Sequence, residues 1–498
     1  MKLNKLFLTG LITLGLFSCT DDNNDAPPVG TEKSAYFSLK LSFPENSSKS
    51  LKAGEPTTGN EDGDGYQNGL ATEQKFSKVA VILVNAANNQ VTDVLSYTSS
   101  DFVPEGNSAT DDNTINPVQN PKNYLTKESK LVTAGDAKVY VFLNPTAEVL
   151  ANFLPVGKIL ASDVIEMPSL SNADLTTGIA KADNFLMGNA EPATIQTIDG
   201  IISDPTVVRV AVERAAVKLV ENTTKATFDV TSTHGAGTVS VTLTNYAYNN
   251  LNKRYFLLKN VQTRSDAGAV AGSYVVDPNF IHSDYKAYAP AEPWFANDFF
   301  VIGNKDVTKP FATTPDITYS LENTMISFEQ YSNRTTSVVY KASVSVDGSS
   351  GTTVYLYKDV LYKSYTDLET AYNVDHATDP LSSLFTESEL DAAYSSGSYS
   401  QAVRALNVEL MDNGVYAYYK GTSYYRWHIK HWEQDVLLGR MEFGLVRNNV
   451  YYLEVTGIRN IGTPWVPGGP ETPDPDPRPD EEDNAYLVIS VDVLPWTV

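Results

Sequence analysis

The C-terminal end of this 498-residue chain joins a proline-rich stretch to a run of alternating apolar residues. Residues 464–484 contain PWVPGGPETPDPDPRPD, and because proline fixes φ and removes amide donors we expect an extended, semi-stiff spacer. Residues 485–498 (AYLVISVDVLPWTV) predict a strand. One face of that strand carries four large apolar side chains: Leu487, Ile489, Val491 and Val493.

A strand at the end of a spacer needs a partner. Alone it can neither satisfy its backbone groups nor cover its apolar face. The pattern predicts pairing at a distance, most simply with another molecule. The alternative is that the strand folds back onto its own C-terminal domain.

The first predicted strand has the same pattern. Residues 34–43 (SAYFSLKLSF) alternate, and Pro44 ends the run. The apolar face of this strand again carries four large side chains: Phe37, Leu39, Leu41 and Phe43. A long polar loop follows at residues 45–68, without apolar periodicity.

The remainder of the chain predicts a mainly β fold. Apolar runs of strand length occur at residues 78–84 and 137–143, and residues 206–220 form either a strand pair or one bent strand. We expect two β-sandwich domains, residues 34–222 and 223–463, with short helical insertions.

Local signals predict particular turns and helix starts. Asp347-Gly348 and Asn413-Gly414 favour hairpin turns. Two pairs with the spacing of a capping box predict short helices: Thr366 with Glu369, and Thr386 with Glu389.

The N-terminus predicts export and lipid attachment. Residues 1–18 have a basic start and a short apolar core, which is typical of a signal peptide. Cys19, the only cysteine, follows LFS and is the predicted lipidation site, with residues 19–33 as a tether. The alternative is an ordinary signal peptide with an incidental cysteine. We expect an outer-membrane lipoprotein precursor that then becomes part of a cell-surface structure.

Composition argues against nucleic-acid binding and against catalysis. The formal net charge of −23 repels phosphate backbones. No nucleophile elbow or phosphate-binding loop is present, and the five histidines lack a metal-ligand pattern. We expect no enzyme activity, no catalytic residues, no metal and no cofactor.

Several segments in a shared order resemble the type V pilus fimbrillins of Bacteroidetes, in particular the shaft subunit of the minor fimbrium. They are SAYFSLKLSFP, KVAVILV, KVYVFLN, VERAAVKLV, YYRW, LVRNNVYYLEVTGI, the Pro-Asp spacer and VDVLPWTV. The resemblance implies two transthyretin-like Greek-key β-sandwich domains. It also implies partners: identical subunits, fimbrial anchor and tip subunits, and a maturation protease.

The resemblance implies polymerisation by donor-strand exchange. Residues 34–52 would be the removable first strand and loop, and residues 485–498 the donor strand of the next subunit. The two strands share four alternating large apolar residues, as interchangeable occupants of one slot require.

The loop departs from the family pattern, in which the cut follows arginine. The first arginine here is Arg209, so the expected cut follows Lys52, before Ala53, or less favourably follows Lys49. A trypsin-like or Lys-specific protease is implied.

Two other functions remain open from the sequence. One is a monomeric surface lipoprotein that binds glycans or a host, and the other is a fimbrial tip or anchor subunit. A surface hydrolase would need a catalytic pair for which the sequence has no motif.

Overall fold

The structure is a computed structural model, and it has the expected mainly β fold. Its sheets pack on one continuous apolar core, with a smaller core under the helices. The described residues are 33–43, 67–105, 123–171, 174–230, 237–264, 272–278, 299–302, 307–325, 330, 334–431, 441–466 and 486–497.

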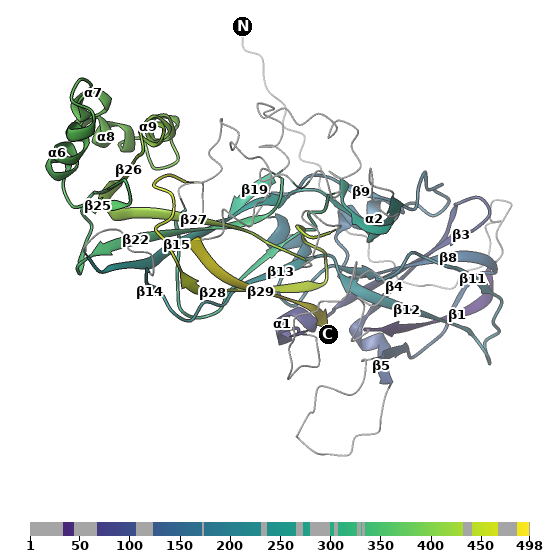
Figure 1. The fold of residues 1–498 in the computed structure, drawn as a ribbon. Coiled ribbons are helices and arrows are strands. Elements are labelled where there is room, and N and C mark those ends of the chain that lie inside the picture. The colour runs from purple at the N-terminus through teal and green to yellow at the C-terminus, as the bar shows by residue number, and fades with distance from the viewer. Residues whose placement is uncertain are drawn as a thin grey trace, which may run out of the picture.

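Ten strands of the first half of the chain form the N-terminal sheet. They are β1 (Lys33–Ser42), β3 (Lys78–Asn85), β4 (Val91–Thr98), β5 (Phe102–Glu105), β6 (Asn123–Thr126), β7 (Lys130–Thr133), β8 (Gly135–Leu143), β10 (Met187–Asn189), β11 (Ile195–Ile198) and β12 (Thr206–Arg214). The order is β4-β3-β8-β10-β12-β1-β6-β5, with β11 beside β8 and β7 beside β1. Figure 1 shows this sheet at the end of the molecule opposite the helices.

Two larger sheets lie mostly in the second half of the chain. The five-stranded sheet has the order β2-β29-β28-β13-β21, and the main path of the seven-stranded sheet is β14-β15-β22-β23. The bounds are β2 (Gln67–Asn68), β13 (Val217–Glu221), β14 (Thr227–Asp229), β15 (Val239–Asn252), β19 (Phe299–Ile302), β20 (Lys309–Pro310), β21 (Asp316–Ser320), β22 (Ser337–Val346), β23 (Ser349–Ser350), β27 (Thr422–His428), β28 (Asn449–Ile458) and β29 (Leu487–Thr497). The two sheets face each other, because Tyr246 on β15 donates to Asp316 on β21 at 2.7 Å.

Residues 206–220 are two strands rather than one bent strand. β12 belongs to the N-terminal sheet and β13 to the five-stranded sheet. Ala215 and Ala216, between them, are both buried in the common core. The chain therefore changes sheets there, ahead of the expected domain boundary at 222–223.

A helical insertion lies at the opposite end from the N-terminal sheet (Figure 1). Four helices, α6 (Tyr365–Asp375), α7 (Leu381–Leu384), α8 (Glu387–Tyr394) and α9 (Gln401–Asp412), accompany a sheet of β24 (Val354–Tyr357), β25 (Val360–Tyr362) and β26 (Val415–Tyr418). Of the described α-helices, two shorter ones lie elsewhere, α1 (Ala71–Gln74) and α2 (Ala147–Ala151).

One predicted capping box is confirmed and the other is wrong. Thr386 and Glu389 cap α8 as expected. At α6 the cap is Ser364, whose hydroxyl accepts from the backbone N–H of Asp367. Thr366 instead lies inside the helix, where its hydroxyl can bond the backbone carbonyl of a preceding residue.

The two predicted turns also differ in outcome. Asp347-Gly348 joins β22 to β23 with both residues at positive φ, as a tight hairpin requires. Asn413-Gly414 does not join two strands, because Asn413 ends helix α9 and Gly414 leads into β26. An Asn-Gly pair indicates that the chain reverses direction, but it does not specify whether a helix or a strand comes before the turn.

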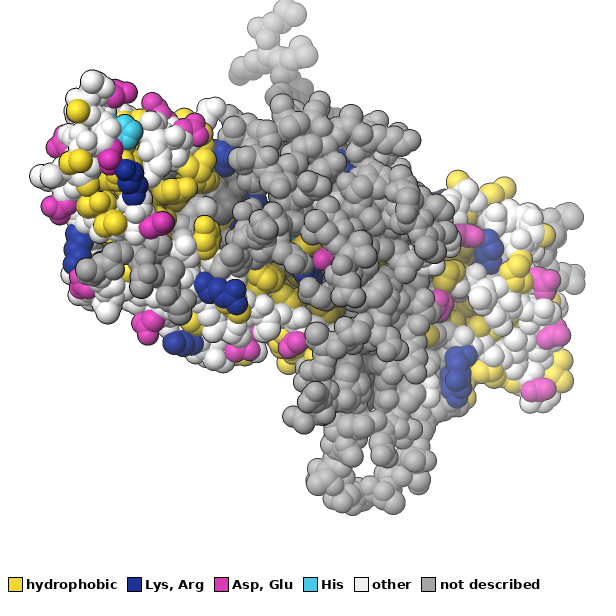
Figure 2. Space-filling model, in the orientation of Figure 1, with side chains coloured by type: hydrophobic (Ala, Val, Ile, Leu, Met, Phe, Trp, Pro, Cys, Tyr) yellow, Lys and Arg dark blue, Asp and Glu magenta, His cyan; other side chains and the backbone are white. Residues whose placement is uncertain are grey.

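The surface in Figure 2 carries Asp and Glu side chains at both ends of the described molecule, interspersed with Lys and Arg. Among the described helices, none is both long and apolar enough to cross a membrane.

Candidate strand-exchange site

Strand β1 lies inside the N-terminal sheet rather than at its edge. It pairs in parallel with β12, for example Leu39 with Val208. On its other side it pairs antiparallel with β6 and β7. Both backbone edges are used, so removal of β1 would leave two rows of ladder groups without their partners.

The predicted apolar face of β1 is confirmed as core. Its four large side chains, Phe37, Leu39, Leu41 and Phe43, are each at most 2% exposed. Burial of four such side chains is worth roughly 6–12 kcal/mol gross. The place that β1 occupies is therefore an apolar slot bounded by β12 on one side and by β6 and β7 on the other.

An aromatic cluster holds the C-terminal end of β1. The ring of Phe43 stacks on Phe76 with centroids 6.2 Å apart and meets Tyr124 edge-on at 5.8 Å. Phe76 also contacts Phe102 and Tyr124 edge-on. Such ring pairs add to the energy of area burial, so this end of β1 is firmly packed.

Strand β29 pairs within its own chain, which differs from the expectation of an external partner. It runs antiparallel to β28, with Val493 opposite Tyr451 and Val491 opposite Leu453. The alternative of folding back onto the C-terminal half is the arrangement in the single subunit. The physical reason is that β28 pairs with β13 along one backbone edge and with β29 along its other edge, so the backbone groups of both β28 and β29 are bonded within one subunit.

β29 is covered less completely than β1. Leu487 is buried, whereas Ile489, Val491 and Val493 pack on the core only partly buried. Within the described part of the chain, its other backbone edge meets only the two-residue strand β2, through Gln67 with Trp496 and Asn68 with Thr497. Most of its length therefore lies close to a sheet edge.

Trp496 is buried at the opposite end of β29 from Leu487; it is only 1% exposed, and both halves of the chain surround it. Its indole N–H donates to Glu73 of α1 at 3.1 Å. Tyr319 of β21 stacks on the indole at 6.0 Å, and Phe185 meets it edge-on at 5.5 Å. The Arg214 guanidinium lies 4.3 Å from the ring centroid and donates to the Trp496 carbonyl at 3.0 Å. We name these four contact residues the Trp496 socket: Glu73, Phe185, Arg214 and Tyr319.

The charges in the socket are matched. Glu73 is fully buried and forms an ion pair with Lys218 of β13 at 2.9 Å. It also accepts from the Tyr319 hydroxyl at 2.6 Å and from the backbone N–H of Leu70 at 2.7 Å. Burial by itself would raise the pKa of Glu73, but these bonds outweigh burial and keep that pKa below its ordinary value. Glu73 is therefore held as a carboxylate.

Sequence reasoning missed this socket. Trp496 was part of the quoted segment VDVLPWTV, and Arg214 and Lys218 were part of VERAAVKLV. A large aromatic residue just beyond the alternating run was the available signal. The partners come from four distant parts of the chain, so no spacing rule could assemble them.

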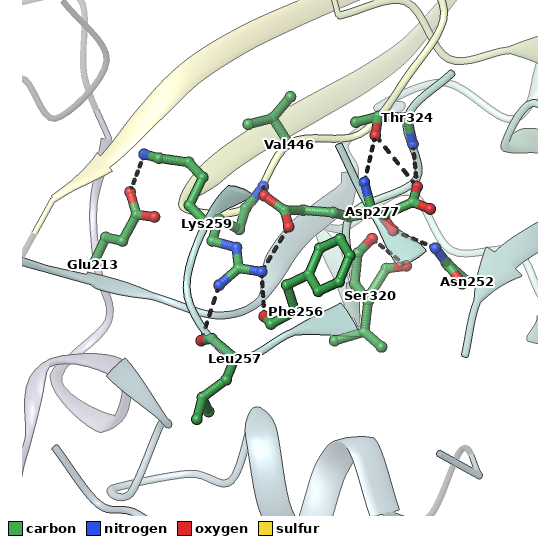
Figure 3. A network of polar contacts seen from close by, with 12 residues as sticks. Glu213, Asn252, Phe256, Leu257, Lys259, Asp277, Ser320, Thr324 and Val446 are labelled. Atoms are coloured by element: carbon green, nitrogen blue, oxygen red, sulfur yellow. Dashed lines mark hydrogen bonds and ion pairs between the residues drawn. The ribbon is translucent and has the colours of Figure 1, made fainter. Parts of the chain in front are cut away.

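A second buried polar network also joins the two halves of the chain (Figure 3). Glu213 on β12 forms an ion pair with Lys259 at 2.6 Å, both side chains being nearly fully buried. Arg447 pairs with Glu322 at 2.6 Å and donates to the Phe256 and Leu257 carbonyls. Burial raises the pKa of Glu213 to about 7, against the opposing charges of Lys259 and Arg447.

The remaining predicted site residues lie outside the described residues. They are Cys19, Lys49, Lys52 and Ala53. Within the described ranges, no group of three or more His, Cys, Asp or Glu side chains is arranged to hold a metal ion.

The C-terminal part of the chain and the chain as a whole are both similar to known fimbrial proteins. Residues 416–498, which include β28 and β29, match the family "Major fimbrial subunit protein type IV, Fimbrillin, C-terminal". The whole chain aligns with "Minor fimbrium subunit Mfa1" of Porphyromonas gingivalis at 21% identity, covering 100% of this chain and 99% of that protein.

Two solved structures are also similar. One is the tip fimbrial protein Mfa3 of Porphyromonas gingivalis with C-terminal truncation, at 10% identity and TM-score 0.41, covering 93% of this chain and 99% of that chain. The other is a fimbrial assembly protein of Parabacteroides distasonis, at 13% identity and TM-score 0.28, covering 62% and 81%. The family match at the C-terminal end and the full-length alignment together show that the chain is similar to the fimbrillins of Bacteroidetes and support its assignment to that family.

Proposed function

We propose that this chain is a structural, non-enzymatic subunit of a surface fimbrium and builds the fimbrial shaft by donor-strand exchange. A protease releases β1, and β29 of a neighbouring subunit takes its place between β12 and the pair β6 and β7. The observation that carries the proposal is the position of β1. It is an interior strand whose removal leaves two backbone edges unpaired and an apolar slot empty.

The two strands match as alternative occupants of that slot. β1 has ten residues and β29 has eleven. Each carries four large apolar side chains in alternation, and side chains of one face enter the slot only if that alternation is kept. The polar residues of β29, such as Ser490 and Asp492, are exposed and would lie on the face away from the slot, where β1 carries Ser38, which is buried, and Lys40, which is partly buried.

Export and processing complete the scheme. Cys19 carries the lipid that holds the precursor at the outer membrane, and a trypsin-like or Lys-specific protease cuts after Lys52 or Lys49. The partners are identical subunits together with the anchor and tip subunits of the fimbrium. The assembled fimbrium supports adhesion and biofilm formation, in keeping with the fimbrial relatives of the chain.

The test is cleavage of the purified chain lacking its signal peptide with a Lys-directed protease. We expect a new N-terminus at Ala53 and a ladder of oligomers that survives mild denaturant, because an inserted strand leaves slowly. A variant with Lys49→Gln and Lys52→Gln should stay uncut and monomeric. A variant that ends at residue 485 should be cut and stay monomeric. A full-length product that loses β1 and remains monomeric would overturn the proposal.

One observation favours a second function. β29 is paired with β28 of its own chain, as expected for a subunit that stays monomeric or sits at a fimbrial tip. In that case cleavage releases β1 without forming a ladder, so the same experiment separates the two functions.

A further inference from the structure

Trp496 makes the most deeply buried side-chain contacts that hold β29 on its own subunit. The three apolar residues at the centre of the strand, Ile489, Val491 and Val493, are only partly buried. Trp496, by contrast, is the largest of the fully buried side chains among the described residues. Its indole is bonded to Glu73, stacked on Tyr319 and covered by Arg214. Extraction of this side chain would leave a buried carboxylate and a buried guanidinium without their aromatic partner, which is costly.

The socket joins the tail to the segment that follows β1 in the chain. Residues Gln67 and Asn68 pair with Trp496 and Thr497, and Glu73 of α1 binds the indole. Arg214 also donates to the Glu73 carbonyl at 3.1 Å, which fixes α1 against the end of β12. Figure 1 shows the C-terminus of the chain beside α1.

The same short segment touches β1. Phe76 lies three residues after Glu73 and stacks on Phe43 at the end of β1. Within residues 73–76, Phe76 therefore contacts the end of β1, and Glu73 hydrogen-bonds to Trp496 of β29. Residues 73–76 can therefore couple the place of β1 to the Trp496 socket, because packing against β1 helps to hold the residues that contact Trp496.

We propose that Trp496 acts as a latch that keeps β29 on its own subunit, and that β1 supports this latch through the contact of Phe43 with Phe76. While β1 fills its slot, residues 67–76 are held against Trp496 and the donor strand is not available. Loss of β1 removes the contact of Phe76 with Phe43, leaves Phe76 with its ring contacts to Phe102 and Tyr124, and loosens the socket. The consequence for assembly rests on the proposed strand exchange. Cleavage that removes β1 opens the slot of a subunit and also frees β29 of that subunit to enter the slot of a neighbour.

Hydrogen–deuterium exchange of the uncut chain tests the latch without requiring polymerisation. Trp496→Ala should accelerate exchange of the amides in residues 487–494 by about a hundredfold or more, given the usual cost of truncating a buried tryptophan. The matched control is Tyr486→Ala, which removes an aromatic ring that is 41% exposed beside the other end of the strand. That control should leave exchange of β29 near the wild-type rate. Unchanged exchange in Trp496→Ala would overturn the latch.

A second pair of variants tests the dependence on β1. Phe43→Ala and Phe37→Ala each remove a buried ring. Phe37 lies near the middle of β1, whereas Phe43 directly follows Ser42, the last residue of β1, and is the one stacked on Phe76. We expect Phe43→Ala to accelerate exchange in residues 487–494 at least about tenfold more than Phe37→Ala. Equal effects of the two variants on β29 would overturn the coupling. If the latch opens in Trp496→Ala but the cleaved variant forms no ladder, the strand-exchange function fails while the latch stands.

Discussion

Two buried carboxylates show how position determines the behaviour of a side chain. Glu73 accepts bonds from Lys218, Tyr319, Trp496 and the Leu70 backbone, so its charge is compensated. Glu213 has the same chemistry and a lysine partner, yet one of its oxygens accepts no bond and its pKa is raised. The number of donors that reach a buried carboxylate decides whether its charge is supported.

The pair formed by Glu73 and Lys218 predicts strong non-additivity. Lys218→Met should lower the free energy of unfolding by about 3–5 kcal/mol, because it leaves a buried carboxylate without its cation. The double variant with Glu73→Gln and Lys218→Met should lose less than the single Lys218→Met variant, since it no longer leaves a buried carboxylate without its lysine. Urea denaturation of the four proteins in this cycle measures the coupling. A double variant less stable than Lys218→Met would contradict the expectation.

At the scale of elements, the alternation of side chains along a strand determines which face is apolar. The backbone edge that is available determines where in a sheet the strand pairs. β1 and β29 have equivalent apolar patterns, but β1 lies between β12 on one side and β6 and β7 on the other, whereas β29 lies close to an edge. A strand with both backbone edges paired is held by its ladder along its full length. A strand near an edge depends more on its anchoring side chains, as Trp496 illustrates.

The slot should accept a free peptide with the right alternation. A peptide of residues 487–497 should bind to and stabilise the subunit from which β1 has been removed, as measured by a rise in its melting temperature. The matched peptide with Val491→Asp should bind at least about a hundredfold more weakly, because it would place a charge in an apolar slot. Equal binding of the two peptides would show that the apolar face is not what the slot recognises.

At the scale of the whole molecule, the two halves are joined by buried polar networks as well as by a common core. Glu213 with Lys259 and Arg447 with Glu322 lie where the N-terminal sheet meets the second half (Figure 3). The Trp496 socket is a separate point of contact. Relative movement of the halves would expose several charges at once, so we expect them to move as one body until the networks break.

The raised pKa of Glu213 should make the stability of the folded chain depend on pH. Its pKa in the folded chain is about 7, above the ordinary value of 4.5, so the folded state binds the proton more tightly than the unfolded state does. The free energy of unfolding should therefore fall as the pH rises from 4.5 to about 7. Glu213→Gln should remove this part of the slope, which thermal unfolding across that pH range would measure. The charged neighbours that also act on Glu213 are Lys259, Arg447 and Glu322.

The sequence alone indicated strands such as β1, β3 and β8 and the buried face of β1, because side-chain direction alternates along a strand and is read from neighbouring residues. The buried face of β1 and the hairpin at Asp347-Gly348 follow from such local rules. The tertiary structure decided which edge each strand joins: β29 pairs with β28, and β12 and β13 enter different sheets. It also brought Glu73, Arg214 and Tyr319 to Trp496. These contacts depend on how residues hundreds of positions apart pack together, and no local period encodes that.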